Sequence, residues 1–128
     1  PIRIVLDRNL SLPPDLYLFD GTQPTIVYHQ NETVNVVERP NVAYAAAQSL
    51  HRVLQDLHQR SIQSVLVEGG TTLLKSFLDA GLWDEMRVFR SQAMLGKGVK
   101  APTVQGDLVS REMIGNDELT IYKNSPGK

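Results

Sequence analysis

The sequence of 128 residues contains no cysteine. This absence excludes a disulfide, a thiol nucleophile and a thiolate metal site within the chain, and it is compatible with a cytoplasmic location. Basic and acidic side chains are nearly equal in number, 13 against 14, so we expect no nucleic-acid partner. No apolar run approaches the ~20 residues that a membrane-spanning helix requires, so we expect no membrane partner either.

Glycine and proline are also few, at nine and seven residues, which excludes collagen and wholesale disorder. The remaining composition is that of a globular protein, and the length suits one domain or part of one. The chain begins with Pro1 and shows neither an initiator methionine nor a signal peptide. We therefore interpret it as a processed product or a piece of a longer protein.

Short apolar runs, several of them β-branched, occupy the first forty residues. Residues 2–6 and 25–28 each have the composition of a short strand, and a third such run spans 34–37. From Asn41 onward the apolar residues recur at spacings of three and four. This pattern predicts one long helix, with Asn41 as its N-cap and Arg60 near its end.

The second half of the sequence predicts a further alternation of strands and helix. A buried strand is expected over 64–67, and a helix over 71–80 that ends at Gly81. Further strands are expected over 84–89 and 119–123. This order predicts an α/β fold with a mixed, mostly parallel sheet flanked by helices.

The most informative motif lies where the expected strand over 64–67 meets the helix over 71–80. Two adjacent glycines, Gly69 and Gly70, allow the backbone to turn sharply and let another molecule approach closely. The free N–H groups at the start of a helix suit a phosphate, and Glu68 precedes this turn at the edge where α/β proteins bind ligands. The alternative is a plain tight turn with a solvated Glu68, because the three spaced glycines of the dinucleotide fingerprint are absent.

The three histidines, one lysine and one arginine each allow both a structural and a functional interpretation. His51 and His58 lie seven residues apart on the expected helix, too far to ligate one metal ion, and His29 lies beside an expected turn. We therefore expect no metal site. Lys97, between two glycines, could bind an anion or belong to a plain connecting loop, and Arg8, after the first strand, could meet a phosphate or be solvated.

Four segments of the sequence resemble one known enzyme family. Residues 1–13, PIRIVLDRNLSLP, resemble the start of the second half of the reductase domain in the bifunctional deaminase/reductase of bacterial riboflavin biosynthesis. Residues 65–73, VLVEGGTTL, and 77–85, FLDAGLWDE, are similar to the family's most recognisable stretch. Residues 95–98, LGKG, are similar to the loop that follows. The resemblance covers nearly the whole chain in the same order.

This resemblance implies a partial dihydrofolate-reductase-like domain, with residues 1–123 as the C-terminal portion of a reductase domain and 124–128 as a frayed tail. It implies NADPH-dependent reduction of the ribosyl side chain of 5-amino-6-(5-phosphoribosylamino)uracil to a ribityl group, with hydride delivered to C1′ of the sugar. Glu68 corresponds to a substrate-binding position, and no catalytic residue is assigned. The positions implied to contact the cofactor are Gly69, Gly70, Thr71, Thr72, Leu73 and, where the family often has serine or threonine, Arg8.

The family's upstream motifs and its zinc deaminase half do not occur in this sequence. The resemblance therefore implies that the chain supplies part of an active site and is inactive alone. It also implies a homodimer, with the strands after Trp83 as candidates for the contact. A non-catalytic assembly or ligand-sensing module of the same fold is the alternative. Dihydrofolate reductase is a further one, although none of its signature segments is found here.

Overall fold

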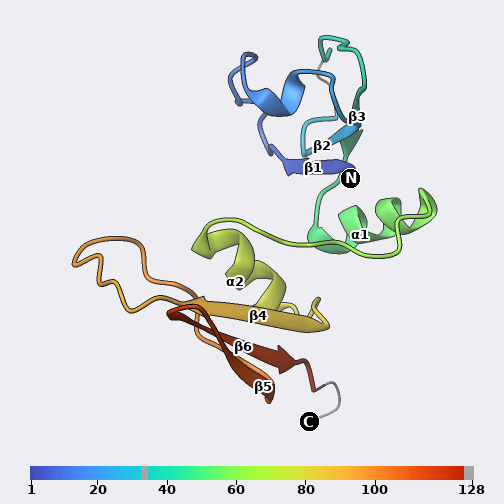
Figure 1. The fold of residues 1–128 in the computed structure, drawn as a ribbon. Helices are drawn as coiled ribbons and strands as arrows, with labels where there is room; N and C mark the ends of the chain where they lie inside the picture. The colour runs from blue at the N-terminus through green and yellow to red at the C-terminus, as the bar shows by residue number, and fades with distance from the viewer. Residues whose placement is uncertain (33–34, 126–128) are drawn as a thin grey trace. The chain divides into compact units, whose positions relative to one another are not determined.

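The computed structural model describes residues 1–32 and 35–125. The chain forms two compact units, residues 1–65 and 66–128. Each unit contains one three-stranded sheet and one α-helix (Figure 1). The α/β class expected from the sequence is confirmed.

The first unit is built on a parallel sheet. Its strands are β1 (Arg3–Leu6), β2 (Thr25–His29) and β3 (Val42–Ala46), in the spatial order β1-β2-β3. A short 3-10 helix, η1 (Tyr17–Phe19), lies in the connection between β1 and β2. The central strand β2 is buried at all five positions, as is usual for a strand of a parallel sheet.

Helix α1 (Leu50–Gln59) covers one face of this sheet. Ile26 and Tyr28 of β2 form a buried cluster with Val53 and Leu57 of the helix. The helix begins after Ser49, whose side chain accepts a hydrogen bond from the backbone N–H of Arg52 at 3.3 Å. This contact is the usual N-cap arrangement.

The long helix predicted from Asn41 is therefore too long at its N-terminal end. Residues 42–46 form β3, paired in parallel with β2, and Asn41 has a positive φ of 63° rather than a cap conformation. The small side chains in this stretch fit either a helix or a strand, and pairing along β2 decides for the strand. Ser49 then caps the shorter helix. Of the strand expected over 34–37, Val34 lies outside the described residues and 35–37 form no strand.

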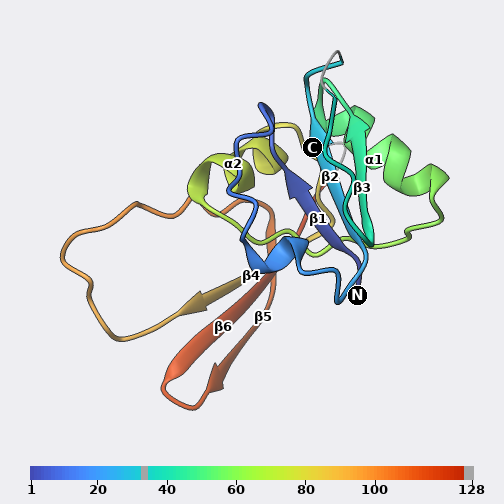
Figure 2. The same cartoon turned by 90° about the horizontal axis from the view of Figure 1, so that it is seen from above.

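The second unit combines helix α2 (Thr71–Asp79) with an antiparallel sheet (Figure 2). Its strands are β4 (Glu85–Arg90), β5 (Asp107–Ile114) and β6 (Asp117–Lys123), in the spatial order β4-β6-β5. The mixed character of the fold thus arises from one parallel and one antiparallel sheet.

The end of α2 follows the sequence prediction closely. Gly81 has a φ of 67°, and its N–H donates to the carbonyl of Leu78. The N–H of Leu82 donates to the carbonyl of Phe77. These two hydrogen bonds form a Schellman motif, which requires a left-handed residue that glycine adopts without strain.

The strand predicted over 64–67 does not form. These residues pair with no strand among the described residues, and the Leu66 side chain is 81% exposed. An apolar run becomes a strand only where another strand supplies hydrogen-bond partners. The composition of the segment is that of a strand, but a pairing partner is missing from the described chain.

The chain remains anchored at Asn124, in the stretch expected to be a tail. The side-chain amide of Asn124 donates to the carbonyl of Trp83 at 2.8 Å, and its backbone N–H donates to the carbonyl of Asp84 at 3.0 Å. Residues 126–128 of the expected tail lie outside the described residues.

Candidate active site

The turn before α2 presents the start of a helix without a side-chain cap. Gly70 occupies the N-cap position with φ −72° and ψ 169°, and it has no side chain that could accept a hydrogen bond. No acidic residue lies in the first turn of α2. The first N–H groups of the helix and the positive end of its dipole are therefore available to an anion.

The two glycines of this turn differ in what surrounds them. A Cβ atom on Gly69 would lie 3.1 Å from Cδ2 of Leu73, so packing against α2 favours glycine there. A Cβ atom on Gly70 would meet nothing within 4 Å. The backbone at Gly70 thus borders open space, which is what a closely approaching ligand needs.

The side chains on either side of the turn differ in their hydrogen bonding. Glu68 is exposed, and no ion pair or hydrogen bond of its carboxylate occurs within residues 1–32 and 35–125. The hydroxyl of Thr71 donates to the carbonyl of Lys100 at 2.7 Å. The hydroxyl of Thr72 has no partner in the described part of the chain, and this side chain is exposed.

Arg8 lies in the other unit, just beyond Asp7 at the carboxyl end of β1 in the parallel sheet. It is exposed, and its backbone carbonyl accepts a hydrogen bond from the N–H of Gln30 at 3.0 Å. Glu68 and the cofactor residues predicted at 69–73 are contiguous in the second unit. The structure therefore describes Arg8 within the first unit and residues 68–73 within the second.

Asp7, to which no functional role is assigned from the sequence, arranges the turn after β1. Its side chain is 7% exposed, and its carboxylate accepts hydrogen bonds from the N–H groups of Ser11 at 3.0 Å and Leu12 at 3.1 Å. An aspartate just after a strand is a sequence signal for a turn, because its short side chain can accept hydrogen bonds from nearby backbone N–H groups. Asp7 thereby fixes the backbone that carries Arg8.

The three histidines differ in burial. His51 and His58 are exposed on α1, whereas His29 at the end of β2 is only 8% exposed. Nδ1 of His29 has no hydrogen-bond partner among the described residues. No group of three or more histidines and acidic residues that could hold a metal ion occurs there either. In the same part of the chain, no helix is long and apolar enough to cross a membrane.

A hydrogen-bonded triad joins α1 to the parallel sheet. The Tyr28 hydroxyl donates to Oδ2 of Asp56 at 2.6 Å, and Nε of Arg60 donates to the same oxygen at 2.7 Å. The hydrogen bond from Tyr28, followed by the one from Arg60, lowers the pKa of Asp56. Burial and the neighbouring carboxylate raise the pKa of the Tyr28 hydroxyl. The triad therefore stabilises the fold rather than supplying a proton donor.

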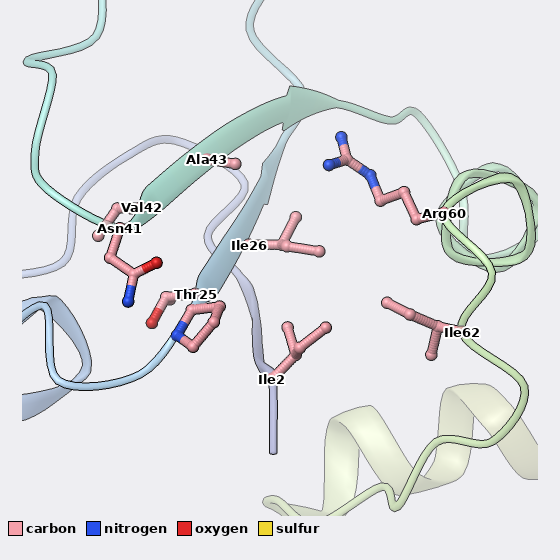
Figure 3. A pocket seen from close by; sticks show the side chains of 9 residues that line it. Ile2, Thr25, Ile26, Asn41, Val42, Ala43, Arg60 and Ile62 are labelled. Atoms are coloured by element: carbon pink, nitrogen blue, oxygen red, sulfur yellow. The ribbon is translucent and has the colours of Figure 1, made fainter.

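The hollow in Figure 3 lies at the amino ends of strands β2 and β3, whereas Arg8 follows the carboxyl end of β1. It has a volume of about 400 Å³ and is lined by residues at the beginnings of β2 and β3, including Thr25 and Val42. Arg60 and Ile62 face it from beyond α1 (Figure 3). Because α/β proteins bind ligands at the carboxyl ends of parallel strands, this hollow is not the expected cofactor site.

Comparison with known proteins assigns the chain to a family. A sequence profile described as the RibD C-terminal domain matches residues 1–122. The chain belongs to the RibD C-terminal domain family. It is 31% identical to the riboflavin biosynthesis protein RibD of Chlamydia pneumoniae over 147 aligned residues, covering 98% of this chain and 39% of that protein.

Other relatives of this RibD C-terminal domain are reductases by name. It is 29% identical to the 2,5-diamino-6-ribosylamino-4(3H)-pyrimidinone 5′-phosphate reductase of Methanothermobacter thermautotrophicus, covering 84% of this chain and 53% of that protein. It superposes with a TM-score of 0.83 and 27% identity on the diaminohydroxyphosphoribosylaminopyrimidine deaminase/5-amino-6-(5-phosphoribosylamino)uracil reductase of Thermotoga maritima. That match covers 98% of this chain and 38% of the Thermotoga protein. The chain thus spans about half or less of these relatives.

Proposed function

We propose that this RibD C-terminal domain takes part in the NADPH-dependent reduction of the ribosyl side chain of 5-amino-6-(5-phosphoribosylamino)uracil to a ribityl group. The names of its relatives support a reductase of riboflavin biosynthesis. The observation that carries the proposal within this chain is the open, uncapped turn at Gly70, in the segment that resembles the family's cofactor-contacting motif. Such an enzyme would act in the cytoplasm.

We further propose that residues 1–123 form the C-terminal portion of the reductase domain and supply part of its site. The profile match over residues 1–122 supports these bounds. The unpaired apolar segment 64–67, with Leu66 exposed, is consistent with a sheet that other residues complete. This chain alone is then expected to bind NADPH weakly and to show no reductase activity.

The residues around the turn fit a nicotinamide cofactor. The N–H groups at the start of α2 would hold an anionic group of the cofactor, and Gly70 would let it approach the backbone. The exposed hydroxyl of Thr72 can donate a hydrogen bond to the same group. When bound, the nicotinamide supplies the hydride that reduces C1′ of the sugar.

Glu68 in the second unit and Arg8 in the first are each proposed to contact a ligand. Glu68 is a free carboxylate beside the turn, suited to accept hydrogen bonds from the hydroxyl groups of the sugar. Arg8 carries a guanidinium at the carboxyl edge of the parallel sheet, where it would bind a phosphate. The role of this chain's residues is then to hold the hydride donor and the acceptor carbon in line.

The test is a substitution at Gly70 in the longest native chain that contains these residues. Gly70→Ser adds a Cβ atom where the protein leaves space and adds a capping hydroxyl, so the stability of α2 is expected to be unchanged or slightly higher. The Michaelis constant for NADPH is expected to rise about tenfold, because the new side chain enters the space assigned to the cofactor.

Steady-state kinetics with NADPH and NADH, together with thermal unfolding, measure both effects. Glu68→Gln in the same assay should lower turnover of the pyrimidine substrate without lowering stability. Absence of reductase activity in the longest native chain, or unchanged kinetics of its Gly70→Ser variant, would refute the proposal. Tight NADPH binding without turnover would favour a ligand-sensing module instead.

We also propose that the protein forms a homodimer through the sheet of the second unit. All eight residues of the edge strand β5 are exposed, including Val109 and Met113. Phe89 of β4 is 65% exposed. Exposed apolar side chains on and beside a sheet edge are common sites of association between chains.

A further inference from the structure

A long segment between β4 and β5 is joined to the rest of the second unit by the hydroxyl of Thr71. Residues 92–105, here called the 92–105 segment, contain no helix or strand. Three of its apolar side chains, Met94, Leu95 and Val99, are 92%, 89% and 88% exposed. A segment with so little burial depends on hydrogen bonds to keep one position.

The hydrogen bonds of this segment are otherwise local. The N–H of Ala93 donates to Oγ of Ser91, and the N–H of Lys97 donates to the carbonyl of Leu95. Within residues 1–32 and 35–125, the bond from Thr71 Oγ1 to the carbonyl of Lys100 at 2.7 Å is the one that ties the segment to another element. It joins two residues 29 positions apart in the sequence.

This bond restricts what Thr71 can do for a ligand. A threonine hydroxyl has a single proton, and here that proton is donated to the Lys100 carbonyl. Phosphate oxygens are hydrogen-bond acceptors, so Thr71 cannot also donate to a phosphate while the bond to Lys100 persists. Thr71 therefore differs from Thr72, whose hydroxyl is free in the described chain.

The bond also determines which residues lie near the turn. It holds the backbone of Lys100 against the first residue of α2, so the lysine side chain begins beside the turn formed by Glu68, Gly69 and Gly70. Among the described residues, neither Lys97 nor Lys100 forms an ion pair. Lys100, which forms no ion pair among the described residues, is thus attached beside the first residue of α2.

We propose that Thr71 is a positioning residue, whose hydroxyl holds the 92–105 segment beside the first turn of α2 so that the segment completes one side of the nicotinamide-cofactor site. This inference rests on the proposed reductase function. In this proposal the Thr71 side chain does not contact the cofactor itself. It affects cofactor binding by holding the 92–105 segment in place.

The test compares Thr71→Val with Thr71→Ser in the longest native chain that contains these residues. Valine has nearly the shape of threonine without the hydroxyl, whereas serine keeps the hydroxyl. Ser76→Ala is the matched control, because it removes a hydroxyl that donates to the Thr72 carbonyl within the same helix and does not touch the segment. Limited trypsin digestion measures release of the segment through cleavage after Lys97 and Lys100.

Thr71→Val is expected to raise the rate of cleavage after Lys97 and Lys100 and the Michaelis constant for NADPH, each about five- to tenfold, as loss of one hydrogen bond allows. The turnover number should stay within about twofold, because the segment acts on cofactor binding rather than on the reacting atoms. Thr71→Ser should restore both values, and Ser76→Ala should match the wild type in both.

Three outcomes would overturn the inference. Unchanged cleavage with a raised Michaelis constant would mean that Thr71 contacts the cofactor directly. Faster cleavage with an unchanged Michaelis constant would mean that the segment does not take part in the site. Unchanged values for both would mean that the bond to Lys100 has no role. Failure of the proposed function is distinguishable, because the wild type would then show no reduction whatever the digestion pattern.

Discussion

At the level of single residues, two glycines of the second unit would tolerate a side chain to different degrees. Gly106 and Gly115 both have positive φ, at 87° and 61°. A Cβ atom on Gly106 would lie 2.4 Å from the carbonyl oxygen of Lys123 and 2.6 Å from Cη2 of Trp83. A Cβ atom on Gly115 would meet nothing within 4 Å. A side chain at Gly115 would therefore cause backbone strain alone, whereas one at Gly106 would cause both strain and steric overlap.

Gly106→Ala is expected to destabilise the second unit by about 3 kcal/mol or more, because β6 and Trp83 must move away from β5. Gly115→Ala carries only the left-handed strain and should cost about 1 kcal/mol. Urea unfolding followed by fluorescence of Trp83, the single tryptophan, measures both variants. Equal losses for the two substitutions would contradict the close approach at Gly106.

At the scale of elements, the Tyr28–Asp56–Arg60 triad fastens α1 to β2. Tyr28 is 2% exposed, and its hydroxyl reaches the carboxylate that Arg60 also contacts. Loss of a hydrogen bond to a charged group at a partly buried site costs about 1–2 kcal/mol. Tyr28→Phe is therefore expected to lower the free energy of opening of α1 by this amount.

The same triad predicts a dependence on pH. The pKa of Asp56 in the folded chain lies below its ordinary value of 3.8, so the folded state binds the proton less readily than the unfolded state. The stabilisation is present above pH 3.8 and is lost as the pH falls through the lowered pKa. Asp56→Asn should therefore weaken α1 at neutral pH and flatten the acid dependence of its stability.

Hydrogen exchange of α1 amides between pH 3 and pH 7 measures this dependence. Asp79→Asn is the control, because Asp79 pairs with Lys75 on the exposed surface of α2 in the other unit. Exposed pairs of this kind contribute about 0.5 kcal/mol or less. An Asp56→Asn variant with the same acid dependence as the wild type would show that the triad is not coupled to folding.

At the scale of the whole molecule, the proposed homodimer can be tested on one face of the antiparallel sheet. Phe89 and Ile114 lie on the same face by the strand register, and they are 65% and 50% exposed. Replacing both by serine should convert a dimer into a monomer in sedimentation velocity. Tyr17→Ser, which alters an 88% exposed side chain in the other unit, should leave the dimer intact. A wild-type chain that stays monomeric at high concentration would refute the dimer.

Several features of this protein could be predicted from the sequence because short-range chemistry determines them. The apolar spacing predicts a helix over 71–80 that ends at Gly81, and the structure has it as α2, Thr71–Asp79. The glycine turn before it could be recognised because Gly69 and Gly70 are adjacent in the sequence, and a Cβ atom on Gly69 would lie 3.1 Å from Leu73 only four residues away. The resemblance of this stretch to a known family pointed to the RibD C-terminal domain family.

The tertiary structure decided what depends on residues far apart in the chain. Residues 42–46 form a strand because they hydrogen-bond in parallel with β2. Residues 64–67 form none, because no strand in the described chain pairs with them. The engagement of Thr71 with Lys100 could not be read from the sequence, since 29 residues separate them. Helix caps and turns are determined by residues a few positions apart. Strand pairing and the hydrogen bond that holds the 92–105 segment require contacts between residues that are distant in the sequence.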